Sequence, residues 1–273
     1  MSSGIREISA AGTWYPEDGE VLLRHIENLL IDFRPDDNTT LDASVVLLPH
    51  SSFAYTAECA CRTLARIDIP DRVLILHTRH VESALGPAYA PYTGWRTPLA
   101  TTTTSLKLNE AIERAGLAVA DEACHEEEHA PEVLLPLFQV LNKDVQIAVI
   151  SVPHLTREAT REFGKSLGKL LADQDEDTLL VVASDLHHYD DRRTTERIDD
   201  LILERIEFFD AEGLMDVAER EDARFFGVSH VAAALIAAKA LGCEEVEIVH
   251  HTDSGEAEGQ IDEVIGYASG FLR

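Results

Sequence analysis

Short apolar runs rich in β-branched residues recur along the chain without polar alternation, a pattern typical of strands that are covered on both faces. Turn-forming residues bound each run. Four of these runs predict core strands, and two more are expected near the C-terminus, the last of them broken by a glycine: residues 43–48, 73–76, 145–150, 178–182, 244–250 and 264–271.

Between these runs lie segments whose apolar residues repeat with helical periodicity. They predict helices at residues 20–33, 57–65, 106–115, 132–141, 156–171, 195–209 and 228–241. Alternating strands and helices with short connections predict an α/β fold in which a mainly parallel or mixed central sheet carries helices on both faces. No linker or internal repeat divides the chain, so we expect one domain over residues 1–273. The threonine run at 101–104 is consistent with a strand or an edge turn.

Composition narrows the protein class. The 273 residues include 50 Asp and Glu against 23 Lys and Arg, a formal net charge of −27. Such a chain repels nucleic acid, whose binding depends on basic side chains. No apolar run approaches the roughly 18–20 residues that span a bilayer, and the start of the chain lacks the features of a secretory signal. We therefore expect a cytoplasmic protein that binds neither nucleic acid nor membrane. The spread of acidic residues suits either a salt-rich cytoplasm or an ordinary acidic bacterial protein.

Histidines stand where predicted strands end. His50 follows the first core strand and His80 the second, His154 follows the third, and His187 and His188 follow the fourth. Ligands of open α/β sheets bind beyond the carboxyl ends of the strands, and imidazole with carboxylate is the usual ligand set of Zn²⁺ and Fe²⁺. The pattern predicts a metal or acid–base site at this rim.

Each of these features also has a simpler interpretation. A single histidine at a strand end is more often a hydrogen-bonded loop residue, and Asp185 could cap a following helix. The acidic stretch 126–128 before His129 is consistent with a solvated helix N-terminus. Cys59 and Cys61 fall in a helical pattern, where two-residue spacing favours packing over ligation. The motifs of P-loop, dinucleotide-binding, nucleophile-elbow and H-E-x-x-H enzymes do not occur.

Taken together, several segments resemble the Memo family, whose bacterial and archaeal members include protein B of the AmmeMemoRadiSam system. The resemblance extends from about Arg6 to Phe271. Its motifs are, in chain order, Ala11-Gly12-Thr13-Trp14-Tyr15-Pro16, Pro49-His50-Ser51-Ser52-Phe53-Ala54-Tyr55, Arg79-His80, Trp95-Arg96-Thr97-Pro98-Leu99, Glu128-His129-Ala130-Pro131-Glu132-Val133-Leu134-Leu135-Pro136 and Ser184-Asp185-Leu186-His187-His188-Tyr189.

The resemblance implies a fold shared with class III extradiol dioxygenases, which are non-haem Fe(II) enzymes. In the family, the positions of His50 and His80 supply histidines to a metal cleft, and those of Asp185 and His188 line it. Family roles range from copper- or iron-dependent redox chemistry to phosphotyrosine-peptide binding. Where some members have a further cysteine ligand, this chain has Phe226.

From these residues we expect His50, His80 and His188 to hold a divalent metal, with Fe²⁺ the first choice and copper or zinc the alternatives. Asp185 would orient a ligating imidazole, and His129 or His188 would act as general base toward a small phenolic substrate. The expected pocket residues are Trp14, Tyr55, Phe226 and His230. The alternative is a metal-free binding module whose cleft captures a small anion or a partner's side chain, a possibility that Phe226 favours. The oligomeric state is left open.

Overall fold

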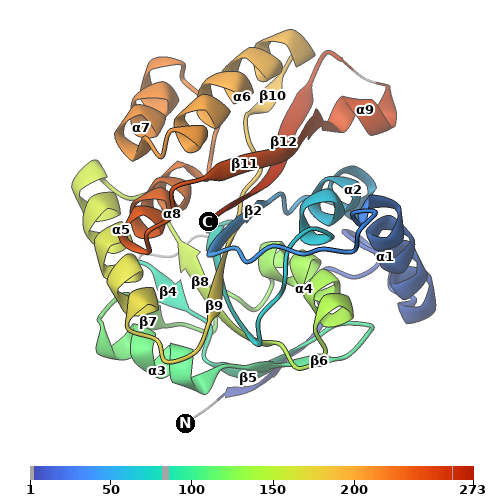
Figure 1. Ribbon diagram of the computed structural model, residues 1–273, viewed down its shortest axis with the longest axis vertical. Coiled ribbons are helices and arrows are strands. Elements are labelled where there is room, and N and C mark those ends of the chain that lie inside the picture. Colours follow the sequence, from blue (N-terminus) through green and yellow to red (C-terminus); the bar gives the residue numbers. More distant parts are fainter. Residues whose placement is uncertain (1–2, 82–85, 260) are drawn as a thin grey trace.

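A single mixed sheet forms the centre of the molecule (Figure 1). The computed structural model describes residues 3–81, 86–259 and 261–273. The main path of the sheet runs β1-β5-β6-β8-β3-β9-β2-β12-β10; β11 pairs with β12, and β4 pairs with β7 and β8. The strands are β1 (Ser3–Arg6), β2 (Val45–Leu48), β3 (Arg72–Thr78), β4 (Ala88–Tyr89), β5 (Tyr92–Arg96), β6 (Thr101–Thr104), β7 (Val119–Ala120), β8 (Gln146–Val152), β9 (Thr178–Ala183), β10 (His188–Asp190), β11 (Val246–Asp253) and β12 (Val264–Leu272).

The four central strands β8, β3, β9 and β2 are parallel. In register, Leu74 of β3 lies between Ala148 of β8 and Leu180 of β9. All three side chains are buried, as their unalternated apolar sequence predicts. Because the strands are parallel, their carboxyl ends meet at one edge of the sheet.

Helices cover both faces of the sheet, and each face has its own hydrophobic core. One face carries α1 (Gly19–Phe33), α2 (Phe53–Leu64) and α4 (His129–Leu141). The other carries α3 (Leu106–Arg114), α5 (Arg157–Ala172), α6 (Arg192–Glu207), α7 (Ala211–Arg220) and α8 (Val228–Ala240). A short helix, α9 (Ser254–Glu258), lies between β11 and β12.

The predicted α/β fold is confirmed, with the sheet mixed rather than wholly parallel. The six apolar runs and the seven helical patterns all correspond to elements of the structure, and residues 101–104 form strand β6. The sequence patterns did not indicate α7, α9 or the short strands β1, β4, β5, β7 and β10, most of which have only two to five residues. Cys59 and Cys61 are buried in α2, in agreement with a packing role.

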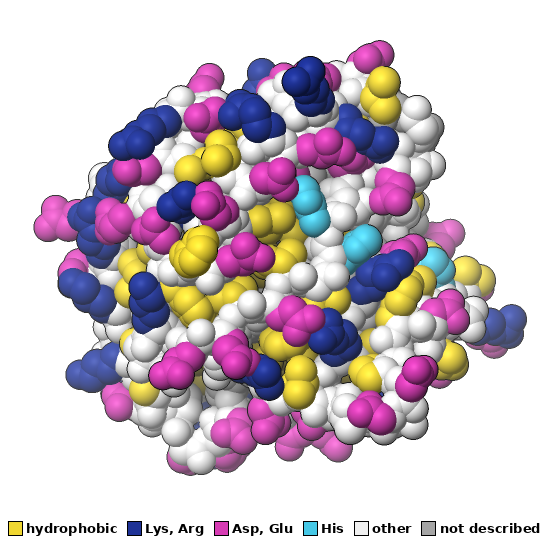
Figure 2. Space-filling view, turned by 45° about the horizontal axis from the view of Figure 1, so that its top comes forward, with side chains coloured by type: hydrophobic (Ala, Val, Ile, Leu, Met, Phe, Trp, Pro, Cys, Tyr) yellow, Lys and Arg dark blue, Asp and Glu magenta, His cyan; other side chains and the backbone are white. Residues whose placement is uncertain are grey.

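The surface mixes charges of both signs. Figure 2 shows acidic and basic side chains interspersed over one face, with hydrophobic surface exposed in a hollow between them. Within the described part of the chain, no helix combines the length and the apolar character needed to cross a membrane.

Candidate metal centre

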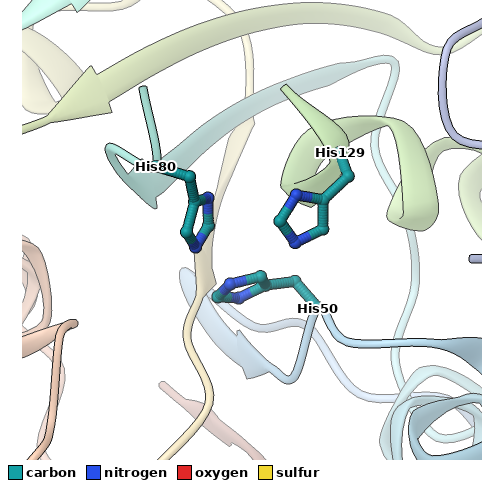
Figure 3. A group of neighbouring side chains, drawn as sticks. All are labelled: His50, His80 and His129. Carbon is teal, nitrogen blue, oxygen red and sulfur yellow. The ribbon is translucent and has the colours of Figure 1, made fainter. Parts of the chain in front are cut away.

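Three histidines from three separate elements converge at the carboxyl edge of the sheet. His50 follows β2, His80 follows β3, and His129 is the first residue of α4. One ring nitrogen from each lies within 4.8 Å of the others, and the ring centroids are 4.6–5.8 Å apart. Figure 3 shows the three rings turned toward one another. His50 is buried, His129 is half-buried and His80 is exposed, so the group is open to solvent on the side of His80.

Glu128 is a buried carboxylate that contacts two of the three histidines. Its side chain is wholly buried, caps α4 through the Ala130 N–H, and has Oε1 2.7 Å from His80 Nδ1. The same oxygen lies 3.4 Å from His129 Nδ1. Burial raises the pKa of the Glu128 carboxyl, but the neighbouring imidazoles outweigh it and hold the pKa well below its usual range. An ionised Glu128 therefore accepts the proton of His80 Nδ1, which leaves His80 Nε2 with a lone pair for a metal.

Burial keeps the His50 and His129 imidazoles neutral. It lowers the pKa of His50 well below the ordinary value, and the adjacent His80 lowers it further. Burial, together with His50 and His80, lowers the pKa of His129 to about 3. His50 Nδ1 is buried without a hydrogen-bond partner in the described protein. Neutral rings with converging lone pairs are the form that Zn²⁺, Fe²⁺ and copper ions require.

Asp185 positions the His50 loop. Its Oδ1 accepts the His50 backbone N–H at 2.9 Å, and its Oδ2 accepts the Ser51 hydroxyl at 2.5 Å. The His50 ring is less closely engaged, with Nδ1 3.9 Å from Asp185 Oδ1. Asp185 does not cap a helix, because the N-cap of α6 is Asp191. The structure thus places this carboxylate beside His50, where it orients the main chain more directly than the imidazole.

His188 lies beside this group but is not part of it. It begins β10, and its ring is 5.0 Å from that of Phe226. Burial lowers the pKa of His188, and its Nδ1 has no partner in the described protein. The geometry therefore brings His129, rather than His188, together with His50 and His80.

The four expected pocket residues occupy different settings. Trp14 stacks on His129, with ring centroids 3.9 Å apart. Tyr55 stacks on Tyr267 at 6.5 Å. His230 is wholly enclosed, with Nε2 3.0 Å from the Ala183 carbonyl oxygen. Only Phe226 lines the cavity that also contains His80.

The sequence alone does not identify Glu128 as a site residue. Glu126 and Glu127 are exposed, as a solvated helix N-terminus requires, but Glu128 is not. The signal in the sequence was its place directly before His129, within a motif that also supplies a ligand candidate. A histidine adjoining a buried carboxylate is a common metal-site arrangement.

Glu128 also adjoins His77, which lies in β3. Atoms of His77, His80 and Glu128 come within 4.8 Å of one another. However, His77 Nδ1 is 2.6 Å from the Thr78 carbonyl oxygen, to which it donates. Since His80 Nδ1 is already bonded to Glu128, these residues form a supporting layer behind the three histidines rather than a second open site.

Comparison with known proteins identifies the family of this chain. Residues 6–271 match the family described as Memo-like protein. A MEMO1 family protein of Aquifex aeolicus is 31% identical over 266 residues, covering 96% of this chain and 97% of that protein. MEMO1 family protein MK0963 of Methanopyrus kandleri is 30% identical, covering 98% and 99% of the two chains. A crystal structure of the uncharacterized protein JW3007 of Escherichia coli K12 has a TM-score of 0.50 at 11% identity, covers 83% of this chain and 98% of its own, and supports the fold alone. The chain belongs to the Memo family.

Proposed function

We propose that this Memo-family protein binds one divalent metal ion through His50, His80 and His129. The observation that carries the proposal is the convergence of three imidazole nitrogens within 4.8 Å. The buried Glu128 behind them supports it, because a carboxylate that fixes the tautomer of a ligating histidine is the usual partner of such sites.

The ligand set favours particular metals. All four cysteines are buried, and none joins the histidine group. The family's cysteine position is occupied by Phe226, which offers no donor atom. A set of imidazoles without a thiolate suits Fe²⁺ or Zn²⁺ better than Cu⁺, which prefers soft sulfur ligands. We propose Fe²⁺ first, with zinc or copper as the alternatives.

Three protein ligands leave coordination positions open, and the exposed His80 places them toward solvent. A metal there would supply Lewis-acid polarisation or redox chemistry to a bound small molecule. With His129 assigned to the metal, His188 is the proposed general base. Burial lowers its pKa, so its neutral ring keeps one lone pair that would accept a proton from a substrate hydroxyl. We propose a phenolic hydroxyl as that donor and dioxygenase-type oxidation as the reaction class.

The test is the metal content of protein purified without a tag or chelator and reconstituted anaerobically with Fe²⁺. We expect about one ion per chain in the wild type and near zero in His50→Ala and His129→Ala, since two imidazoles hold an ion far less tightly than three. Retention of stoichiometric metal by His129→Ala would refute this ligand set. Absence of metal from the wild type would favour the metal-free binding module.

A further inference from the structure

A cavity of about 660 Å³ lies beside the histidine group, and His80 is one of its lining residues. Its walls come from the end of β3, the start of α5, α7 and the segment that leads into α8. The volume falls within the usual range for small-molecule sites. Much of the lining is apolar, contributed by Leu155, Met215, Ala218, Phe225, Phe226 and Val228.

The segment 223–227 that forms one wall is fixed by side chains from β3 and from the loop between β9 and β10. Thr78 Oγ1 donates to the Phe226 carbonyl oxygen at 3.1 Å. The Arg224 backbone N–H donates to His187 Nδ1, also at 3.1 Å. Next along the chain, Ser229 Oγ accepts the Leu155 N–H at 2.9 Å. A wall anchored in this way is formed before a ligand arrives, which reduces the entropic cost of binding.

Arg224 gives the cavity an available positive charge. Its Nη1 donates to the Tyr189 carbonyl oxygen at 2.6 Å, which orients the guanidinium without neutralising it. Within residues 3–81, 86–259 and 261–273, no carboxylate pairs with Arg224, and its Nε and Nη2 make no hydrogen bond. Glu219, the carboxylate among the described lining residues, is instead bound to Arg157 at 2.9 Å. In a chain of net charge −27, an uncommitted arginine beside an apolar cavity favours an anion.

We infer that this cavity binds a small carboxylic acid with an apolar body. The carboxylate would lie on the Nε–Nη2 edge of Arg224, whose two parallel donors match its two oxygens. The apolar body would pack against Phe225, Val228 and Met215. The apolar end of the acid would lie near His80, where it could contact a bound metal. Only this last point rests on the proposed function.

The test compares 3-phenylpropionate with its neutral analogue 3-phenylpropanamide, using isothermal titration of chelator-treated protein. We expect saturable binding, with the acid bound about tenfold more tightly than the amide because only the acid forms the charged bidentate pair. In Arg224→Gln this preference should vanish. In Arg193→Gln, which removes an exposed arginine elsewhere, it should remain.

A second variant tests the location. Ala223→Phe narrows the cavity without changing its charge, and it should weaken both probes equally. Failure of either probe to bind at millimolar concentration would overturn the inference. Equal binding of acid and amide by the wild type, an unchanged preference in Arg224→Gln, or unchanged affinity in Ala223→Phe would also overturn it. Metal content measured in parallel separates this result from the proposed metal site, because the titration needs no metal.

Discussion

Histidines at the same edge of one sheet have different roles in this protein. His50 and His80 share a space with His129, and each has at least one nitrogen that the described protein leaves unused. His187 follows the neighbouring strand β9, but both of its nitrogens are engaged: Nδ1 accepts the Arg224 N–H, and Nε2 lies 3.0 Å from Asp190 Oδ2. His154, which follows β8, is exposed and lies outside the histidine group.

The difference shows that a place at the end of a strand is not enough to make a histidine a metal ligand. A histidine becomes a ligand candidate when a partner fixes one nitrogen and the other faces further donors, as Glu128 achieves for His80. When the backbone and a carboxylate occupy both nitrogens, as at His187, the ring instead fastens one loop to another. Substitutions at the two kinds of strand-end histidine should therefore differ in their effect on metal binding.

Replacing His80 by alanine removes one of the three proposed metal ligands and also the hydrogen bond to Glu128. We expect bound Fe²⁺ to fall from about one per chain to near zero, a loss in affinity of more than about 100-fold. His154→Ala is the matched control, since it removes an exposed strand-end histidine, and it should keep full metal content. Equal metal loss in both variants would remove the distinction between the two positions.

Glu128→Gln retains the shape of the side chain but not its charge. Because a neutral amide orients and polarises His80 less strongly, we expect metal affinity to fall about tenfold. Competition with a chromogenic chelator measures the change. Glu127→Gln removes an exposed charge one residue away and should leave the affinity unaltered. Wild-type affinity in Glu128→Gln would show that Glu128 has no role in supporting the site.

Acid should destabilise the metal-free protein, because the folded state holds His129 neutral. Its pKa is about 3 when folded and about 6.5 when unfolded, so the unfolded chain binds more protons between these values. The free energy of unfolding therefore falls as pH drops below about 6.5, by about 1.4 kcal/mol per pH unit for each such histidine. Urea unfolding at several pH values between 4.5 and 6 measures this dependence. In His129→Asn, the free energy of unfolding should change with pH less steeply than in the wild type, by this amount per pH unit. An unchanged slope would contradict the neutral state of the ring.

His188→Ala should have the smallest effect on metal binding. Since His188 lies outside the histidine group, we expect its loss to change Fe²⁺ affinity less than about threefold. Chelator competition provides the measurement, and thermal unfolding checks that the variant is folded. If His188→Ala lost as much Fe²⁺ affinity as His129→Ala, the result would favour the ligands expected from the sequence, His50, His80 and His188.

Much of the fold could be predicted from the sequence. Buried parallel strands such as β3 and β9 need continuous apolar residues, and amphipathic helices such as α5 need a periodic stripe, so both leave clear local patterns. Short strands such as β4 and β7 are held by hydrogen bonds to distant segments, and their two residues carry no pattern of their own. The site is predictable only in part, because strand-end histidines are visible in the local sequence whereas contacts between distant segments are not.

The choice between His129 and His188 depends on how α4 packs against the sheet. Both lie within motifs that make them candidates, but only packing brings the first turn of α4 beside His50 and His80. The acidic neighbours of Glu128 in the sequence predict a solvated side chain. Its burial follows from the imidazoles that surround it, which lie 48 or more residues away in the chain, apart from His129. Local sequence does not contain such long-range contacts.

A crystal structure of the protein loaded anaerobically with Fe²⁺, with anomalous differences measured at the iron edge, would locate the metal directly. We predict one peak, bonded to nitrogens of His50, His80 and His129, with Glu128 still bound to His80 Nδ1. A peak bonded to His188 in place of His129, or no peak at the three histidines, would rule out this metal site.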